Sequence, residues 1–216
     1  MGLYARLETI YKLKIYIIEM EIDKMINNVN DAERLAYKYF KDKVDKGDNP
    51  YMEHLQFVAN SCLYTDAKIV GMLHDIIEDT DINMNELENE LPINLIESIQ
   101  HLSKPKDIKY SEYIDNLCKS NDLLAMEVKM HDLEHNMDLS RLKKIEQIDL
   151  DRKRKYKKAY KKICEKYKEL LITEILKITN NNKELKLFLK DKKLNEIKTT
   201  YETIMLYKTI EEKCRI

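Results

Sequence analysis

The chain of 216 residues has few turn-forming residues, with three Gly and three Pro. Sandwiches and barrels built from many short strands need such residues at their turns, so this scarcity argues against both folds. Three glycines are also too few for a Gly-rich loop that cradles phosphate groups. With 44% hydrophobic and 36% charged residues, the composition suits a globule with a densely charged surface. We therefore predict an all-α protein.

An excess of charge of one sign is missing as well. The chain has 38 Lys and Arg against 39 Asp and Glu, which argues against a polybasic clamp for nucleic acid. No apolar run approaches the roughly 18 residues that a membrane-spanning helix needs. The cysteines form no Cys-x-x-Cys pair, so we expect reduced thiols and neither a disulfide framework nor a zinc knuckle: Cys62, Cys118, Cys164 and Cys214. We expect a cytoplasmic protein that binds neither nucleic acid nor membranes.

Apolar residues recur at helical spacing along most of the chain. Asp31, Asn49 and Asn121 precede such segments and are the predicted helix caps. One continuous helix is predicted from Thr65 or Asp66 through Ile77. Further helices are predicted near 85–91, starting at Pro92, over 111–118 and over 149–178. Two short helices are predicted within 183–213. The pattern predicts an N-terminal extension of uncertain structure (1–19), a central domain (20–170) and a helical appendage (171–216).

Histidine is scarce, and four of the five copies lie in three short segments rich in carboxylates: Pro50–His54, Leu73–Asp79 and Lys129–Asn136. His74 and Asp75 are adjacent, so on a helix both can reach one ion in a bundle core. Glu78 and Asp79 lie four residues beyond them, one turn along the same face. This layout suits metal-assisted hydrolysis, in which an ion lowers the pKa of bound water and a nearby carboxylate moves the proton.

A His-Asp pair near a helix end has a simpler interpretation as a surface hydrogen bond or a cap. Apolar residues flank this pair on both sides, however, and buried charges are costly unless they are paired or bound to a metal. His54, Glu78-Asp79 and Asp132 accompany the pair in order, which favours the functional interpretation.

These segments resemble motifs of the HD superfamily of metal-dependent phosphohydrolases, and within it the RelA/SpoT-type hydrolase domain and its small single-domain relatives. Three motifs carry the resemblance. A pattern of roughly Lys-x-Gly-x-Pro-Tyr-x-x-His is matched from Lys46 to His54, with Gly47 one position early. Leu-His-Asp-x-x-Glu-Asp-Thr is matched from Leu73 to Thr80, and Val-Lys-x-x-Asp-x-x-x-Asn-Met from Val128 to Met137. A weaker resemblance extends from Ala32 to about Leu170 and does not reach the tail.

The resemblance implies an HD-domain helical bundle with a C-terminal helical appendage, and one divalent ion, usually manganese, with iron as the alternative. The implied ligands of the ion are His54, His74, Asp75 and Asp132. Glu78 and Asp79 match the catalytic acidic pair, which orients and activates the attacking water. The implied contacts to the nucleotide are Lys46, Asn136, Arg152 and Tyr156.

The resemblance further implies hydrolysis of a phosphorylated nucleotide, with guanosine 3′,5′-bispyrophosphate as the preferred substrate and pyrophosphate as a product. We expect no synthetase activity, because the residues after Leu170 are too few for a separate synthetase domain. Asp45 stands where long members often have Arg, and Leu139 replaces a Thr; both departures favour another 3′- or 2′-phosphorylated nucleotide such as NADPH. A catalytically silent HD domain that binds a nucleotide or a partner is the alternative from another class.

Two other features have weaker functional interpretations. His131 and His135 are spaced as in a zinc-protease helix, but Asp132 occupies the place where that motif needs Glu, and no third ligand is evident. The basic run Arg152–Lys158 spreads around a helix, so part of it is solvated surface and part can attract an anionic nucleotide. The C-terminal helices are the surface that we expect any homo-oligomer to use.

Overall fold

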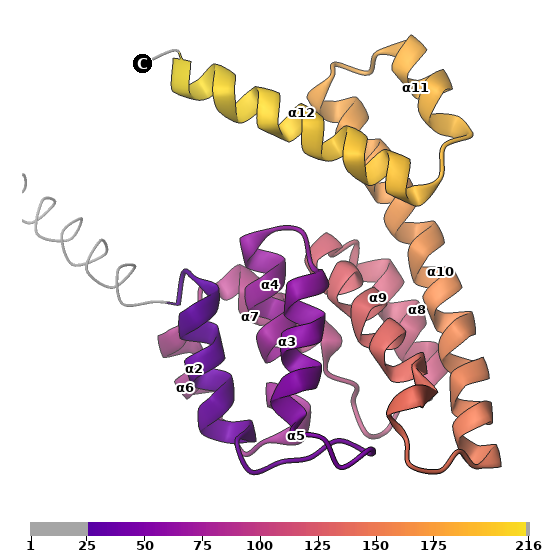
Figure 1. Cartoon of the computed structure of the whole chain (residues 1–216). Coiled ribbons are helices and arrows are strands. Elements are labelled where there is room, and N and C mark those ends of the chain that lie inside the picture. Colours follow the sequence, from indigo (N-terminus) through magenta and orange to yellow (C-terminus); the bar gives the residue numbers. More distant parts are fainter. Residues whose placement is uncertain (1–25, 215–216) are drawn as a thin grey trace, which may run out of the picture. The chain divides into compact units, whose positions relative to one another are not determined.

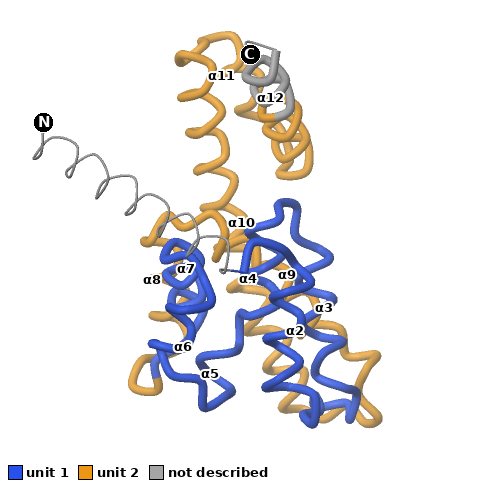
Figure 2. Tube along the Cα trace, turned by 90° about the vertical axis from the view of Figure 1, so that its left-hand side faces the viewer, with its two compact units in different colours: residues 1–105 blue, residues 106–216 orange. Residues whose placement is uncertain are grey.

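The computed structural model describes residues 26–214, and all regular elements in that range are helices (Figure 1). The predicted all-α class is confirmed. None of the described helices has an apolar stretch long enough to cross a membrane. The chain divides into two compact units, residues 1–105 and 106–216 (Figure 2). The predicted extension over 1–19 lies outside the described residues, and the predicted boundary at 170 stays a prediction.

The first unit is built around one short helix, α4, whose C-terminal half is fully buried. Its helices are α2 (Val29–Phe40), α3 (Tyr51–Ser61), α4 (Thr65–Leu73), α5 (Ile76–Asp79), α6 (Met84–Glu90) and α7 (Ile93–Leu102). Helices α2, α3 and α7 all pack against α4 and bury Ala67 and every residue from Ile69 to Leu73. The fully buried side chains of this core include Phe40, Leu55, Ile69, Leu73, Ile76 and Ile99.

Three predicted caps are wrong by a few residues. Asn28, not Asp31, caps α2, and its side chain accepts a hydrogen bond from the Asp31 backbone. Pro50 itself is the N-cap of α3, so Asn49 lies outside that helix. Asn121 ends the preceding helix in the left-handed region, and Asp122 caps the next one. Asn28 and Asp122 have the side chains that cap α2 and α9, whereas Pro50 makes no side-chain cap of α3.

The single helix predicted through Ile77 is broken in the structure. Helix α4 ends at Leu73, and Asp75, with φ −99° and ψ 3°, forms the N-cap of the short helix α5. His74 and Asp75 therefore lie in a tight connection between two helices. The Asp79 backbone N–H still donates to the Asp75 carbonyl over 2.8 Å, so the i, i+4 relation of Asp75 and Asp79 is kept.

Gly71 allows α3 and α4 to approach closely. A Cβ atom at this position would lie 3.1 Å from the Ala59 Cα atom and 3.2 Å from its backbone nitrogen. Both atoms belong to the backbone of α3, which cannot move aside as a flexible side chain would. The close approach matters for the rest of the unit, since α3 carries His54 and α4 leads into His74.

The second unit is organised along one long helix, α10. Its elements are α8 (Tyr110–Ser120), α9 (Leu123–Met137), a 3-10 turn (Leu139–Arg141), α10 (Gln147–Ile178), α11 (Lys183–Lys190) and α12 (Leu194–Cys214). Helices α8, α9, α11 and α12 all contact α10. Buried residues recur every four positions along it, at Ala159, Ile163, Tyr167, Leu171 and Ile175, which is the spacing of one helix face.

The C-terminal helices are connected to α9 by a largely buried ion pair. Lys198 Nζ, on α12, lies 3.5 Å from Glu127 Oε1, on α9, and the two side chains are 19% and 2% exposed. Lys198 also lies over the ring of Tyr167, with its Nζ 5.3 Å from the ring centroid. Of the two predicted helices in this region, the second is long, with 21 residues.

We predict that Gly71→Ala lowers the free energy of unfolding by about 1–3 kcal/mol, because overpacking against α3 outweighs the gain in helix propensity. Urea unfolding would measure the change. Asn60→Ala, at an exposed position of α3, is the control and should be neutral or slightly stabilising. A stabilised Gly71→Ala variant would contradict the close approach of α3 and α4.

We also predict that Lys198→Met lowers the free energy of unfolding by about 2 kcal/mol, because it removes the cation that faces a buried carboxylate. The matched control is Lys192→Met, which removes an ion pair of 2.8 Å with the half-exposed Glu196 and should cost less than about 1 kcal/mol. Adding Glu127→Gln to Lys198→Met should restore part of the stability. Equal losses in the two single variants would contradict the importance of the buried pair.

Candidate metal centre and acidic pair

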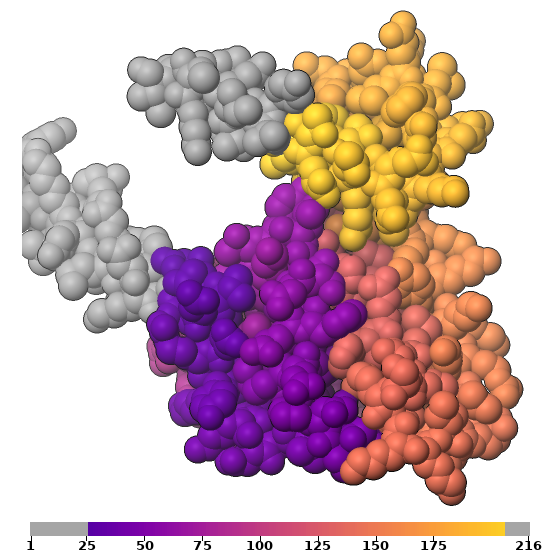
Figure 3. Space-filling view, in the orientation of Figure 1, coloured from indigo at the N-terminus to yellow at the C-terminus, as the bar shows by residue number. Residues whose placement is uncertain are grey.

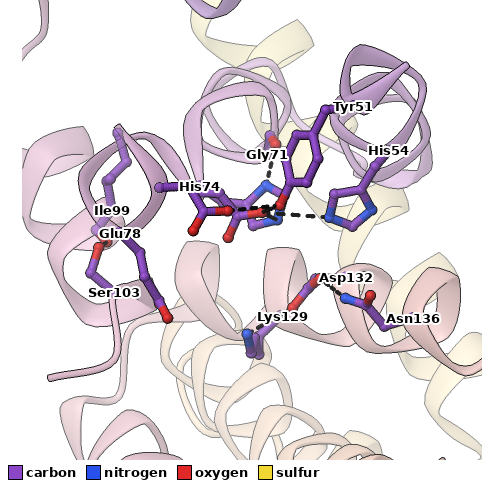
Figure 4. A network of polar contacts seen from close by, with 12 residues as sticks. Tyr51, His54, Gly71, His74, Glu78, Ile99, Ser103, Lys129, Asp132 and Asn136 are labelled. Atoms are coloured by element: carbon purple, nitrogen blue, oxygen red, sulfur yellow. Dashed lines mark hydrogen bonds and ion pairs between the residues drawn. The ribbon is translucent and has the colours of Figure 1, made fainter. Parts of the chain in front are cut away.

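Three predicted ligands converge in the first unit. One ligand atom each of His54, His74 and Asp75 lies within 4.8 Å of the other two. Asp75 Oδ2 is 3.0 Å from His74 Nε2 and 3.6 Å from His54 Nε2 (Figure 4). Both imidazoles are buried, and the Asp75 carboxylate is 20% exposed. The group can therefore be reached from solvent on its carboxylate side.

The donor set of this cluster fits a divalent cation. His74 Nδ1 lies 2.7 Å from the Gly71 carbonyl oxygen, which can only accept, so Nδ1 carries the proton and neutral His74 presents the lone pair of Nε2. That lone pair faces a carboxylate oxygen, and the two groups repel unless a proton or a cation lies between them. Two imidazole nitrogens with a carboxylate suit Mn, Fe or Zn better than Mg or Ca.

Tyr51 connects the cluster to the acidic pair. Its hydroxyl lies 2.6 Å from Asp75 Oδ2 and 3.1 Å from Asp79 Oδ2. The ring is held by stacking on Phe40, with centroids 5.2 Å apart, and its edge meets the His54 ring. The hydroxyl has a single proton, and its shorter contact is with Asp75. In the sequence Tyr51 is only one position of a motif, and no role could be predicted for it.

Glu78 and Asp79 are exposed at the end of α5. Glu78 Oε2 accepts a hydrogen bond of 3.0 Å from the Lys104 backbone N–H, beyond the end of α7. Asp79 accepts from Tyr51 through its side chain and from the Lys43 ammonium through its carbonyl oxygen. The two carboxylates are thus oriented by different elements of the first unit, and each stays open to water.

Asp132 belongs to the second unit, where both of its oxygens have donors. Lys129 Nζ lies 2.7 Å from Oδ2, and the Asn136 amide donates to Oδ1 (Figure 4). Burial opposes the charged form of Lys129, but the Asp132 carboxylate holds the pKa of this lysine well above its usual value. Lys129, three residues before Asp132, therefore supplies a permanent positive charge beside it. In the sequence, the only sign that Lys129 places a positive charge beside Asp132 is its spacing of one helix turn from that residue.

The predicted substrate contacts lie on different elements. Arg152 Nη2 is 2.6 Å from Asp149 Oδ1, so the guanidinium is held against its own helix. Tyr156 lies one turn further along α10, with its ring 5.7 Å from that of Tyr110. Both residues share the second unit with Asp132 and Asn136, whereas Lys46 is exposed in the loop before α3 of the first unit.

The loop around Lys46 gives the Asp45 carboxylate a structural role. Asp45 Oδ1 accepts hydrogen bonds from the Gly47 and Asn49 backbone N–H groups, over 2.7 and 3.0 Å. The Asp45 N–H in turn donates to the Asn49 carbonyl over 2.8 Å. The carboxylate is therefore a loop-closing group, which an Arg in its place could not be.

The zinc-protease interpretation of His131 and His135 gains no support. His131 Nδ1 lies 2.7 Å from Glu134 Oε2 on the same helix, and Glu134 also accepts from the Tyr160 hydroxyl over 2.5 Å. Within the described part of the chain, the cluster of His54, His74 and Asp75 is the one group of three His, Cys, Asp or Glu residues with converging ligand atoms.

Comparisons with known proteins agree with this fold. No protein-family model matches the chain. A solved structure, described as a metazoan orthologue of SpoT that hydrolyses ppGpp and plays a role in starvation responses, is similar with a TM-score of 0.54 and 20% sequence identity. The similarity covers 80% of this chain and 94% of that one. The predicted resemblance to the small SpoT-type hydrolases is confirmed at the level of the fold.

We predict that Tyr51→Phe weakens Mn²⁺ binding by about 10- to 100-fold, the usual effect of removing a group that orients a ligand. The ring can still stack on Phe40, so the free energy of unfolding should fall by no more than about 1.5 kcal/mol. Isothermal titration with Mn²⁺ and urea unfolding would measure the two effects.

The control is Tyr39→Phe, which removes a hydroxyl that donates to Glu86 over 2.5 Å in the same unit. It should cost similar stability and leave Mn²⁺ affinity unchanged. Equal Mn²⁺ affinities in the two variants would show that the Tyr51 hydroxyl does not orient Asp75.

Proposed function

We propose that the protein is a metal-dependent phosphohydrolase of the HD type that releases pyrophosphate or phosphate from a nucleotide. Guanosine 3′,5′-bispyrophosphate is the preferred candidate substrate, and the proposed reaction is hydrolysis without synthesis. The observation that carries the proposal is the convergence of His54, His74 and Asp75 within 4.8 Å of one another, beside an exposed pair of carboxylates. The fold shared with a hydrolase of ppGpp supports the choice of substrate.

His54, His74 and Asp75 would hold one divalent ion, with Asp132 as the fourth ligand on the strength of the sequence pattern. Two carboxylates would then balance the charge of the ion, and we favour Mn, with Fe as the alternative. A bound ion of this kind lowers the pKa of water and polarises a phosphoryl oxygen.

The acidic pair would manage the proton of the attacking water. Glu78 is held through Oε2 by the Lys104 N–H, and we assign Oε1 to accept the proton. Asp79, which accepts from Tyr51, would orient the water. Because both carboxylates are exposed, the proton can pass to solvent after each turnover.

The nucleotide contacts that we propose come from the sequence pattern. Lys46, Arg152 and Tyr156 are proposed to contact the phosphates and sugar, with Asn136 as an amide donor. Arg152 is already held by Asp149 at 2.6 Å, which lowers the entropy lost when it binds an anion. Phosphate groups suit a planar guanidinium, which can donate two parallel hydrogen bonds.

Another 3′- or 2′-phosphorylated nucleotide, such as NADPH, is the second candidate. Asp45 closes its own loop, so this position offers no guanidinium to stack on a guanine. Leu139 is buried, and the adjacent Ser140 hydroxyl donates to Asp138 over 2.7 Å. Neither position supplies the group that larger relatives use there, which favours a different base or a less selective pocket.

The test is release of phosphate and pyrophosphate by the Mn²⁺-loaded protein from guanosine 3′,5′-bispyrophosphate, NADPH and ordinary nucleoside triphosphates. Glu78→Gln should keep Mn²⁺ bound and lower kcat by about 10²- to 10⁴-fold, as expected for loss of a general base. Asp75→Ala should lose both Mn²⁺ and turnover.

The outcomes separate the candidates. Turnover of guanosine 3′,5′-bispyrophosphate alone supports the preferred substrate, and turnover of NADPH alone supports the second. An unchanged rate in Glu78→Gln removes Glu78 from the mechanism. Tight Mn²⁺ binding without turnover of any nucleotide would contradict the proposed activity and indicate a binding domain.

A further inference from the structure

A groove of about 630 Å³ lies between α8 and α10 of the second unit. This volume is within the range of pockets that hold small molecules, roughly 300–1,000 Å³. The residues that line it belong to neither the proposed metal site nor the acidic pair, and the proposed substrate contacts Arg152 and Tyr156 do not line it either. The groove adjoins one of these contacts, because the ring of Tyr110, which lines it, lies 5.7 Å from the ring of Tyr156.

One wall of the groove is a basic stripe on α10. Arg154, Lys155, Lys158 and Lys162 line it, and their spacing places them along one face of the helix. They include three residues of the basic run Arg152–Lys158, which the sequence predicts to be partly solvated surface. The side chains of α10, in orange, form much of the right-hand edge of the surface in Figure 3, and these four are exposed.

The floor of the groove is apolar and aromatic. Ile114 and Ala159 are buried, and the half-buried Tyr110 presents its ring. Lys155 Nζ lies 4.5 Å from the centroid of that ring, which is within the range of a cation–π contact. A flat apolar group placed against Tyr110 would thus lie directly beside an ammonium group.

Positive charge predominates along the lining. The four cationic side chains share the groove with two carboxylates, Asp115 and Asp151. Asp151 pairs with Arg154 at 3.2 Å, and Asp115 pairs with Lys162. The lining therefore holds four cationic side chains against two carboxylates, and an added anion would meet a net positive charge.

We propose that this groove binds a nucleotide with two or more phosphates. The base would lie against Tyr110 and Ile114, and the phosphates beside Lys155 and Lys158. A nucleotide fits better than a bare anion because the floor is apolar, and better than a nucleic acid strand because the whole chain carries a net charge of −1. The proposal does not depend on the hydrolase activity.

The test is equilibrium binding of GTP, guanosine and inorganic tripolyphosphate to the full chain in EDTA, where a metal-dependent site cannot act. We expect GTP to bind more tightly than either fragment. Lys155→Glu/Lys158→Glu should weaken GTP binding by about 100-fold or more, roughly tenfold for each ammonium–phosphate hydrogen bond that is removed.

The matched control is Lys153→Glu/Lys157→Glu, with the same change of charge on exposed positions of the same helix that do not line the groove. It should weaken GTP binding by less than about threefold at 0.15 M salt, where distant charges are screened. Amide hydrogen exchange should show protection of residues 110–115 by GTP in the unaltered protein. Thermal unfolding checks that both double variants stay folded.

Equal weakening in the two double variants would overturn the proposal, because the effect would then be general electrostatics. Tripolyphosphate binding as tightly as GTP would overturn the nucleotide assignment. The nucleotide assignment would also be overturned if a single-stranded oligonucleotide bound more tightly than GTP, with an affinity that grows with its length. Failure of the hydrolysis assay leaves each of these results unchanged.

Discussion

The close packing of α3 on α4 at Gly71 determines where the functional side chains of the first unit lie. Any larger residue at that position would meet the α3 backbone at 3.1 Å, and the separation of the helices sets that of His54 and His74, whose ring centroids are 5.1 Å apart. The Gly71 carbonyl also accepts from His74 Nδ1, which directs Nε2 toward Asp75. One residue thus controls the distance between the imidazoles and the orientation of one of them.

The break between α4 and α5 places Asp75 and the acidic pair. Asp75 leaves helical geometry, and the helix resumes at Ile76, so its carboxylate faces the two imidazoles. Its Oδ2 atom meets His74, His54 and the Tyr51 hydroxyl. The same hydroxyl lies 3.1 Å from Asp79, so one side chain contacts both the carboxylate proposed to hold the ion and the one proposed to orient the water.

The helical class and the grouping of His54, His74 and Asp75 could be predicted, because scarce residue types recur in short segments and helical spacing is visible over long stretches. The break of the helix at Asp75 could not be predicted, because Glu78 and Asp79 continue the spacing of one helix face across it. The role of Tyr51 depends on a contact with Asp75 across the fold, and that of Lys129 on a contact with Asp132 one helix turn away. A single residue in a sequence is a weak signal for either contact. The interpretation of Asp45 as a change in base recognition stays a prediction. The hydrogen bonds by which its carboxylate closes a loop could not be predicted from the sequence.

Each unit compensates its own buried or half-buried carboxylate. In the first, the Tyr51 hydroxyl donates to Asp75; in the second, Lys129 and Asn136 donate to Asp132. An unpaired buried charge would be strongly destabilising, and these donors offset part of that cost whether or not an ion is bound. Structural zinc domains differ, because the metal supplies much of their folding free energy. In this protein the apolar core around α4 and the buried residues along α10 supply stability through side chains that are not proposed metal ligands.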